Sequence, residues 1–233
     1  MTLAIHLGCL VAVLVSCHKR IGRLLREDRH ARRFRDRPGR SVDKVAVLDM
    51  RVLRTAAVPV LIGAMLGQRY GDWATGLVPL SVLLLVNGVI LFLPTLLPQA
   101  NKDSRSMSML DSILIGVGAA IGSVPGLSRT GCAISAALIR GVDRYHVLDF
   151  ALLLTIPALL IVAVFDLIAV IGAKMAVTAM GLLIYVSIAA LAFACGYAGI
   201  VIMRYLSSKD ALLSFCYYSW GMALFTFVLY LMI

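Results

Sequence analysis

Long apolar runs alternate with short polar and charged segments along the whole chain. A helix needs about 20 apolar residues to cross the roughly 30 Å hydrocarbon core of a membrane. The pattern predicts two membrane helices within residues 52–97, at 52–67 and 75–97. It predicts three more within residues 147–233, at 147–173, 175–203 and 211–233. The chain is therefore expected to be all-α and to form a single integral-membrane domain over residues 1–233.

The first apolar run, residues 2–16, is too short to cross a membrane by itself. A signal peptide carries its positive charges before the apolar stretch, whereas here Lys19, Arg20 and Arg23 come after it. We predict a first membrane helix at residues 2–17 whose beginning is missing or abbreviated. With the five later helices, this makes about six transmembrane helices.

Apolar residues make up 61% of the 233 residues and charged residues 15%, whereas soluble domains have about 45–50% and about 25%. This composition excludes a soluble globular protein, and the recurring apolar runs exclude a disordered chain. The five cysteines are scattered singly and no Cys/His cluster has metal-ligand spacing. No metal site is therefore predicted.

A basic segment accounts for most of the formal net charge of +10. Residues 19–54 hold 13 of the 22 Lys and Arg residues and 5 of the 12 Asp and Glu residues. We predict a basic cytosolic loop at residues 18–51 that faces anionic lipid head groups. Binding to nucleic acid is not favoured, because no aromatic residues are interleaved with the charges and no nucleic-acid-binding fold is recognisable.

Residues 109–139 differ from the other apolar regions, because two short apolar stretches flank the sequence PGLSRTG. One interpretation is a single kinked helix that spans the membrane, and the other is a re-entrant helix pair with PGLSRTG at its tip. A re-entrant pair keeps Arg140 and Arg144 on the cytosolic side with the basic loop, and two helices later also Arg204 and Lys209. The positive-inside rule therefore favours the re-entrant pair.

Arg129 is the candidate functional residue of this region, because an arginine at membrane depth is costly unless it is paired or hydrated. It lies between the hydroxyls of Ser128 and Thr130, at the start of a short helix whose N-terminal N–H groups attract anions. These groups together predict a phosphate cradle. The alternative is an ion pair between Arg129 and a membrane aspartate, for which the candidates are Asp111, Asp149 and Asp166.

The stretch GAAIGSVPGLSRTGCAISAALIRGVDRYHVLDFALLLTIPALL resembles the second signature of the bacterial undecaprenyl-diphosphate phosphatase family, which is linked to bacitracin resistance. That signature reads P-G-x-S-R-S, then G-x-T-I-S, G-V-x-R and an F-x-L-x-x-P helix. The N-terminal IHLGCLVAVLV also resembles the H-L-G-T-L-L-A-V helix of this family. The resemblance covers nearly the whole chain and is weakest across the basic segment.

The resemblance implies two inverted repeats, each with a re-entrant pair, whose tips meet at the active site. It assigns diphosphate binding to Arg129 and hydroxyl contacts to Ser128 and Thr130. The residues that it assigns to shaping the loop are Pro125, Gly126 and Gly131, and it places Ser135 in a supporting position. The implied reaction is hydrolysis of undecaprenyl diphosphate to undecaprenyl phosphate and phosphate in the bacterial plasma membrane, which recycles the lipid carrier of cell-wall synthesis.

The sequence also departs from this family. The first signature, E-G-x-x-E-F-L-P-x-S-S-x-G-H, precedes the H-L-G helix in the family, whereas here only Met1 and Thr2 precede it and Glu27 is the sole glutamate. Ala119 replaces a glutamine and Ala133 a threonine. The inverted-repeat architecture is therefore expected to be incomplete, and the chain alone to be inactive or nearly so.

His6 is the best remaining candidate for managing protons, because it lies on the matched helix. A structural role for this lone histidine is the alternative, and His18, His30 and His146 are expected to be solvated. Two rival functions remain, a polyprenyl-phosphate transporter or carrier and a relative that binds prenyl phosphates without hydrolysing them. The sequence leaves open a divalent-cation cofactor such as Mg²⁺ or Ca²⁺, the prenyl chain length and a homodimer.

Overall fold

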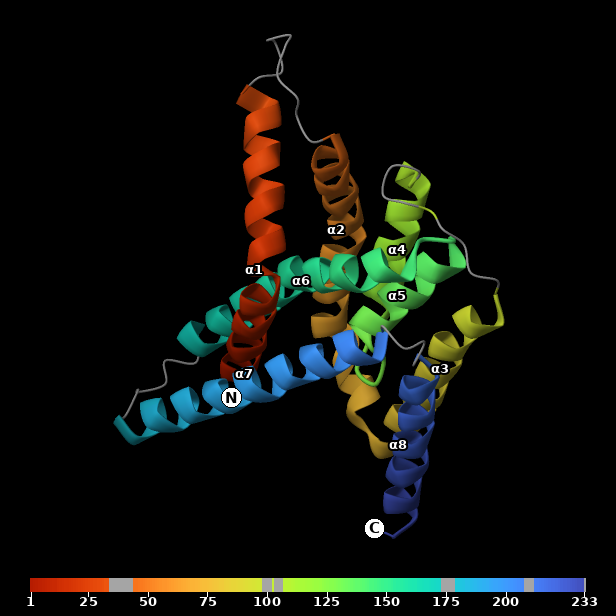
Figure 1. Ribbon diagram of the computed structural model, residues 1–233. Coiled ribbons are helices and arrows are strands. Elements are labelled where there is room, and N and C mark those ends of the chain that lie inside the picture. The colour runs from red at the N-terminus through yellow and green to blue at the C-terminus, as the bar shows by residue number, and fades with distance from the viewer. Residues whose placement is uncertain (34–43, 98–101, 103–106, 173–178, 208–211, 233) are drawn as a thin grey trace.

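The computed structural model describes residues 1–33, 44–97, 102, 107–172, 179–207 and 212–232 (Figure 1). Within these residues it is helical throughout, apart from turns and one isolated bridge between Lys102 and Val142. The elements are α1 (Thr2–Arg33), α2 (Lys44–Tyr70), η1 (Gly71–Thr75), α3 (Leu77–Phe92), η2 (Leu93–Leu96), α4 (Met109–Ile121), α5 (Arg129–Ile139), α6 (Arg144–Gly172), α7 (Ala179–Ser207) and α8 (Leu212–Met232).

The predicted all-α membrane class is confirmed. Six segments of the described chain are long and apolar enough to cross a membrane, and they correspond to the six predicted helices. The 3₁₀ helices η1 and η2 follow α2 and α3. The predicted helix at 75–97 is divided after Phe92, where η2 begins at Leu93. Pro94 lies in the first turn of η2 and cannot donate the backbone hydrogen bond that would continue the α-helix.

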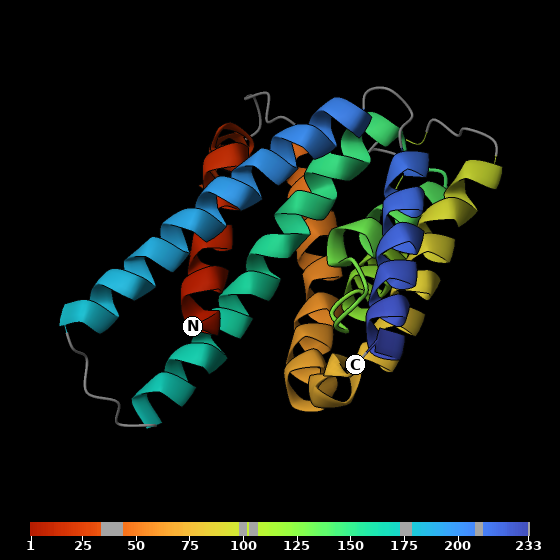
Figure 2. The same cartoon turned by 90° about the horizontal axis from the view of Figure 1, so that it is seen from below.

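The long helices form two groups with a short hairpin between them. On one side α1 crosses α6 and α7, and on the other α3 and α8 lie side by side, as both views show (Figures 1 and 2). Helix α2 packs against α4 and α6, and α5 packs against α3 and α6. The core is made of small and aliphatic side chains such as Ala12, Val60, Ala133 and Leu154, which lets the helices approach closely.

The prediction of a loop over residues 18–51 is wrong for most of this segment, which is helical. Helix α1 continues to Arg33 and α2 already begins at Lys44, so that only residues 34–43 lie outside the described part. Arg, Leu, Ala and Glu are good helix formers, and no proline interrupts α1 before its end. Ion pairs also hold the charged ends, since Arg20 binds Asp149 at 2.7 Å and Arg54 binds Asp28 at 2.6 Å.

Candidate functional site: the loop between two short helices

Helices α4 and α5 form an antiparallel hairpin. At its open end the Arg140 Nε of α5 donates to Asp111 Oδ1 of α4 at 2.6 Å. At its closed end Gly122 lies directly against Arg129, and a β-carbon on Gly122 would be 2.5 Å from the Arg129 Cα. The two helices have 13 and 11 residues, which at 1.5 Å per residue is too short for either to cross a bilayer alone.

The sequence PGLSRTG forms the turn and the first helical residues at the tip of this hairpin. Gly126 has φ +89°, a backbone conformation that side chains with a β-carbon rarely adopt. Ser128 is the N-cap of α5, and its hydroxyl accepts a hydrogen bond from the Gly131 N–H at 3.1 Å. A β-carbon on Gly131 would lie 2.9 Å from the same hydroxyl. Glycines at these positions therefore allow the tight turn into α5.

Arg129 is the half-buried cation of the tip. Its Nε donates to the Ser123 hydroxyl at 3.2 Å. This neutral partner leaves the positive charge uncompensated, and no carboxylate within the described residues lies within ion-pair distance of it. A guanidinium remains charged in a protein and has five N–H donors, so Arg129 keeps donors available for an anion.

The alternative interpretation, an ion pair between Arg129 and a membrane aspartate, is wrong. All three aspartates bind other basic side chains. Asp111 binds Arg140 and Lys102, Asp149 binds Arg20 and Arg204, and Asp166 binds His6. These three aspartates therefore do not neutralise the positive charge of Arg129 at the tip of the hairpin.

His6, the candidate for managing protons, is held by a carboxylate on another helix. Its Nδ1 lies 2.7 Å from Asp166 Oδ2, which joins α1 to α6. No hydrogen bond in the described part of the chain joins His6 to the tip. Of the other histidines, the exposed His18 contacts the Val15 carbonyl, while the side chains of His30 and His146 lie outside the described ones.

Two further hydroxyls of α5 differ in their surroundings. The Thr130 Oγ1 lies 3.4 Å from the Thr155 Oγ1 of α6, which itself donates to the Ala151 carbonyl. The Ser135 hydroxyl is 1% exposed and has no hydrogen-bond partner among the described residues. Sequence reasoning placed Ser135 beside the site but did not identify Thr155.

Asn87 is a second residue of the site that sequence reasoning missed. It is buried in α3, and its Oδ1 accepts a hydrogen bond from the Ser128 backbone N–H at 2.8 Å. Its Nδ2 donates to the Ser219 hydroxyl of α8 at 3.0 Å, and that hydroxyl donates to the Leu84 carbonyl at 2.8 Å. The Asn87 side chain therefore links the tip of the hairpin to both α3 and α8. The available signal was an amide within an otherwise apolar membrane helix, which is a functional hypothesis by default.

We expect Asn87→Leu to lower both the thermal stability of the purified protein and its affinity for prenyl phosphates. The substitution leaves the Ser128 N–H unpaired, at a cost of about 1–3 kcal/mol, and releases the backbone next to Arg129. The measurements are thermal unfolding in detergent and equilibrium binding of farnesyl phosphate.

Ser81→Ala is the matched control, because Ser81 is also buried in α3 but bonds only to the Val78 carbonyl of its own helix. An Asn87→Leu protein that loses stability but binds farnesyl phosphate like Ser81→Ala would contradict the positioning of the tip by Asn87.

Metal-ligating side chains do not gather at the tip. No group of three His, Cys, Asp or Glu side chains able to hold a metal occurs among the residues that the structure describes. The donors at the tip are instead a guanidinium, hydroxyls and backbone N–H groups, and this donor set suits an anion.

The fold and the tip together define a class: a multi-pass helical membrane protein in which a charged, hydroxyl-bearing turn joins two short helices. Residues 1–225 match the family model described as "Bacitracin resistance protein BacA". The chain belongs to this family, as its second signature indicated.

Relatives named "Undecaprenyl-diphosphatase" match the chain over different lengths. The protein from Methanobrevibacter smithii is 32% identical over 96% of this chain and 81% of its own length. The one from Syntrophotalea carbinolica is 29% identical over 94% and 79%. The one from Carboxydothermus hydrogenoformans is 32% identical, but the match spans only 60% of this chain and 54% of that relative.

Proposed function

We propose that this protein binds undecaprenyl diphosphate in the bacterial plasma membrane and hydrolyses it to undecaprenyl phosphate and phosphate. Membership of the BacA family and the name of the relatives support the reaction. The observation that carries the proposal is the charge of Arg129, which no carboxylate among the described residues neutralises. Binding of an anionic ligand offsets the free-energy cost of placing the Arg129 cation within the membrane.

We also propose that α4 and α5 are a re-entrant pair that enters from the cytosolic side. The Asp111 pairs with Arg140 and Lys102 put the start of α4 and the end of α5 at one level. Asp149, near the start of α6, pairs with Arg20 and Arg204. Cations from α1, α5 and α7 thus lie near the start of α4 or α6, in agreement with the positive-inside rule.

The roles at the tip follow from the charge that the reaction has to handle. Water attacks the terminal phosphorus, the bond to the bridging oxygen breaks, and that oxygen leaves on undecaprenyl phosphate. Arg129 binds the phosphate oxygens and stabilises the charge that develops on them. Thr130 adds a hydroxyl contact, whereas the Ser128 hydroxyl holds the start of α5 through Gly131.

The candidate site is less well equipped for proton transfer than for phosphate binding. An attacking water or serine needs a base within hydrogen-bond reach. Within the described residues, the side chains of Arg129, Thr130 and Ser128 bond to hydroxyls and a backbone N–H instead. We therefore expect this chain to bind its substrate well and to hydrolyse it slowly. The same observation favours the second candidate, a relative that binds prenyl phosphates without hydrolysing them.

The discriminating experiment measures phosphate release and ligand binding on the same preparation. The purified chain is placed in lipid nanodiscs with undecaprenyl diphosphate, and the binding of undecaprenyl phosphate is measured in parallel. Phosphate release that depends on Arg129 supports the phosphatase, and binding without release supports the non-catalytic relative. Absence of both would contradict the proposed function.

A further inference from the structure

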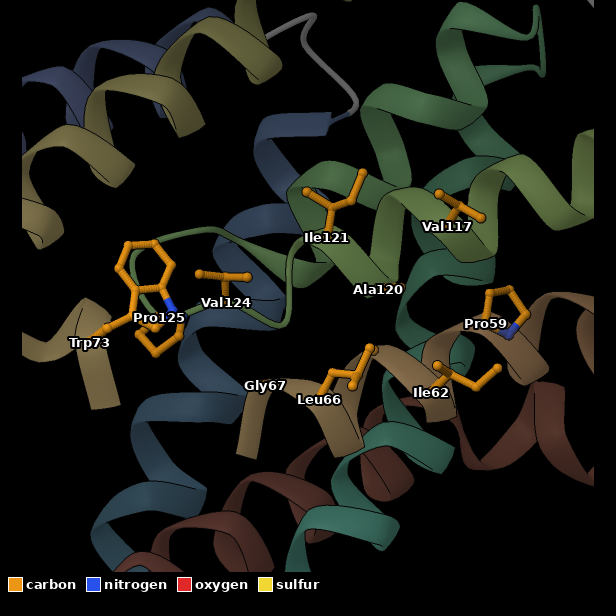
Figure 3. A pocket seen from close by; sticks show the side chains of 11 residues that line it. Pro59, Ile62, Leu66, Gly67, Trp73, Val117, Ala120, Ile121, Val124 and Pro125 are labelled. Atoms are coloured by element: carbon orange, nitrogen blue, oxygen red, sulfur yellow. The ribbon is translucent and has the colours of Figure 1, made fainter. Parts of the chain in front are cut away.

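An apolar groove runs along α2 and α4 up to the tip of the hairpin. Its volume is about 400 Å³, within the range of about 300–1,000 Å³ that is usual for ligand pockets. Figure 3 shows side chains of α2 and α4 along it, with Val124, Pro125 and Trp73 at one end. The lining residues of the two helices are Pro59, Ile62, Gly63, Leu66, Gly67, Val117, Ala120 and Ile121.

The groove exists because the two helices touch where their residues are small. A β-carbon on Gly63 would clash with Ala120, so the backbones of α2 and α4 are in direct contact there. Larger side chains rise on both sides of this contact, and Ile62 is 54% and Ile121 51% exposed. The contact between Gly63 and Ala120 forms the bottom of the groove, and apolar side chains such as Ile62 and Ile121 form its sides on the surface of the bundle.

The groove ends near the candidate phosphate site. Val124 and Pro125, which line its end, belong to the turn that leads to Arg129. Ser123 connects the two features, because its hydroxyl accepts from the Arg129 Nε and its carbonyl packs against Gly67 of the groove. A ligand with a charged head at Arg129 would therefore have its apolar chain beside this end of the groove.

We propose that this groove binds the isoprenoid chain next to the diphosphate of the lipid substrate; this rests on the function proposed above. The groove supplies a predominantly apolar contact, and its volume accommodates the first isoprene units of a long prenyl chain rather than the whole of it. Trp73, which is 60% exposed, lies at the end of the groove nearest Pro125 (Figure 3), where its ring is placed to contact the head-proximal part of the chain.

The test uses a farnesyl diphosphate that carries a photoactivatable benzophenone on its chain. After irradiation of the protein in nanodiscs, the labelled residues are identified by mass spectrometry. We expect labels at residues 59–67 and 117–125, and their removal by an excess of undecaprenyl phosphate. A phosphatidylglycerol with the same photoactivatable group is the second arm, and we expect excess undecaprenyl phosphate to remove less of its labelling.

Ile62→Trp fills the groove, and Val58→Trp is its control one turn away. Both residues are on α2 and exposed, at 54% and 57%, but Val58 does not line the groove. We expect Ile62→Trp to weaken binding of the farnesyl probe roughly tenfold and Val58→Trp to leave it within twofold.

Equal effects of the two variants, or groove labels that only excess phosphatidylglycerol removes, would overturn the assignment of the groove. These outcomes are independent of catalysis, because they are binding measurements. Phosphate release with no label in the groove would refute this inference alone, and competed groove labels without release would refute the phosphatase alone.

Discussion

Arg129→Ala is expected to weaken binding of undecaprenyl diphosphate by about a hundredfold or more, and to reduce any phosphate release by about the same factor. Two charge-assisted hydrogen bonds contribute roughly 1.5–3 kcal/mol each, and each 1.4 kcal/mol is a factor of ten. The other groups of the tip cannot replace this charge, since the nearby hydroxyls of Ser123 and Thr130 are neutral. Binding titrations and phosphate release in nanodiscs measure both effects.

Two further substitutions test whether the expected loss is specific to the guanidinium group at position 129. Arg129→Lys keeps the charge but loses the planar fork that binds phosphate oxygens in pairs, so an intermediate loss is expected. Arg54→Gln removes a half-exposed arginine of α2 that pairs with Asp28, and binding is expected to stay within twofold. Equal losses in Arg54→Gln and Arg129→Ala would show a general effect of charge and contradict the cradle.

The stability of Arg129→Met gives an independent signature. A half-buried cation without a carboxylate partner costs folding free energy, so an apolar residue of similar length should leave the melting temperature unchanged or raise it. Sites that lose function and gain stability in this way are typical of ligand binding. A clear fall in melting temperature would instead indicate that Arg129 is a structural residue.

Asp111→Ala is expected to destabilise the protein by about 1–3 kcal/mol, because it removes the acceptor of the Ser108 N–H and the partner of the partly exposed Arg140. Asp111 is 1% exposed and binds Arg140 at 2.6 Å. It also accepts from the Ser108 backbone N–H at 3.0 Å and thereby completes the capping box of α4. The substitution therefore removes the start of α4 and its link to α5 together, which denaturant or thermal unfolding in detergent will show.

Asp28→Ala is the matched control, because Asp28 (14% exposed) and its partner Arg54 (50%) are both more exposed than Asp111 (1%) and Arg140 (39%). Exposed pairs contribute about 0–1 kcal/mol, so only a small change is expected. Asp111→Asn should fall between the two, since an amide can still accept the bond from Ser108. If Asp111→Ala were no more destabilising than Asp28→Ala, the hairpin would not depend on this ion pair.

The pattern of apolar residues was sufficient to predict the helices but not their polar ends. A run of apolar residues reports where a helix is buried in lipid, and α1 extends past that point to Arg33. Its charged part is held by contacts far away in sequence, such as the pair between Arg20 and Asp149. Such pairs depend on how the helices pack, which periodicity along one segment does not contain.

In the candidate site too, contiguous residues could be predicted from the sequence, whereas partners on other helices could not. PGLSRTG could be recognised because its residues are contiguous, and the structure places them at the tip of a hairpin. Asn87, 41 positions before Ser128, and Thr155, 25 after Thr130, were not found. The competing ion pairs of Arg129 could be excluded only from the structure, in which Asp111, Asp149 and Asp166 bind other basic side chains.

The most direct test of the central claim compares binding of farnesyl diphosphate and farnesol to the wild-type protein and to Arg129→Ala in nanodiscs. The two ligands share one chain and differ only in the diphosphate, so the ratio of their affinities isolates recognition of the head group. We predict a strong preference for the diphosphate in the wild type and its near-complete loss in Arg129→Ala. An equal preference in both proteins would contradict recognition of the diphosphate by Arg129.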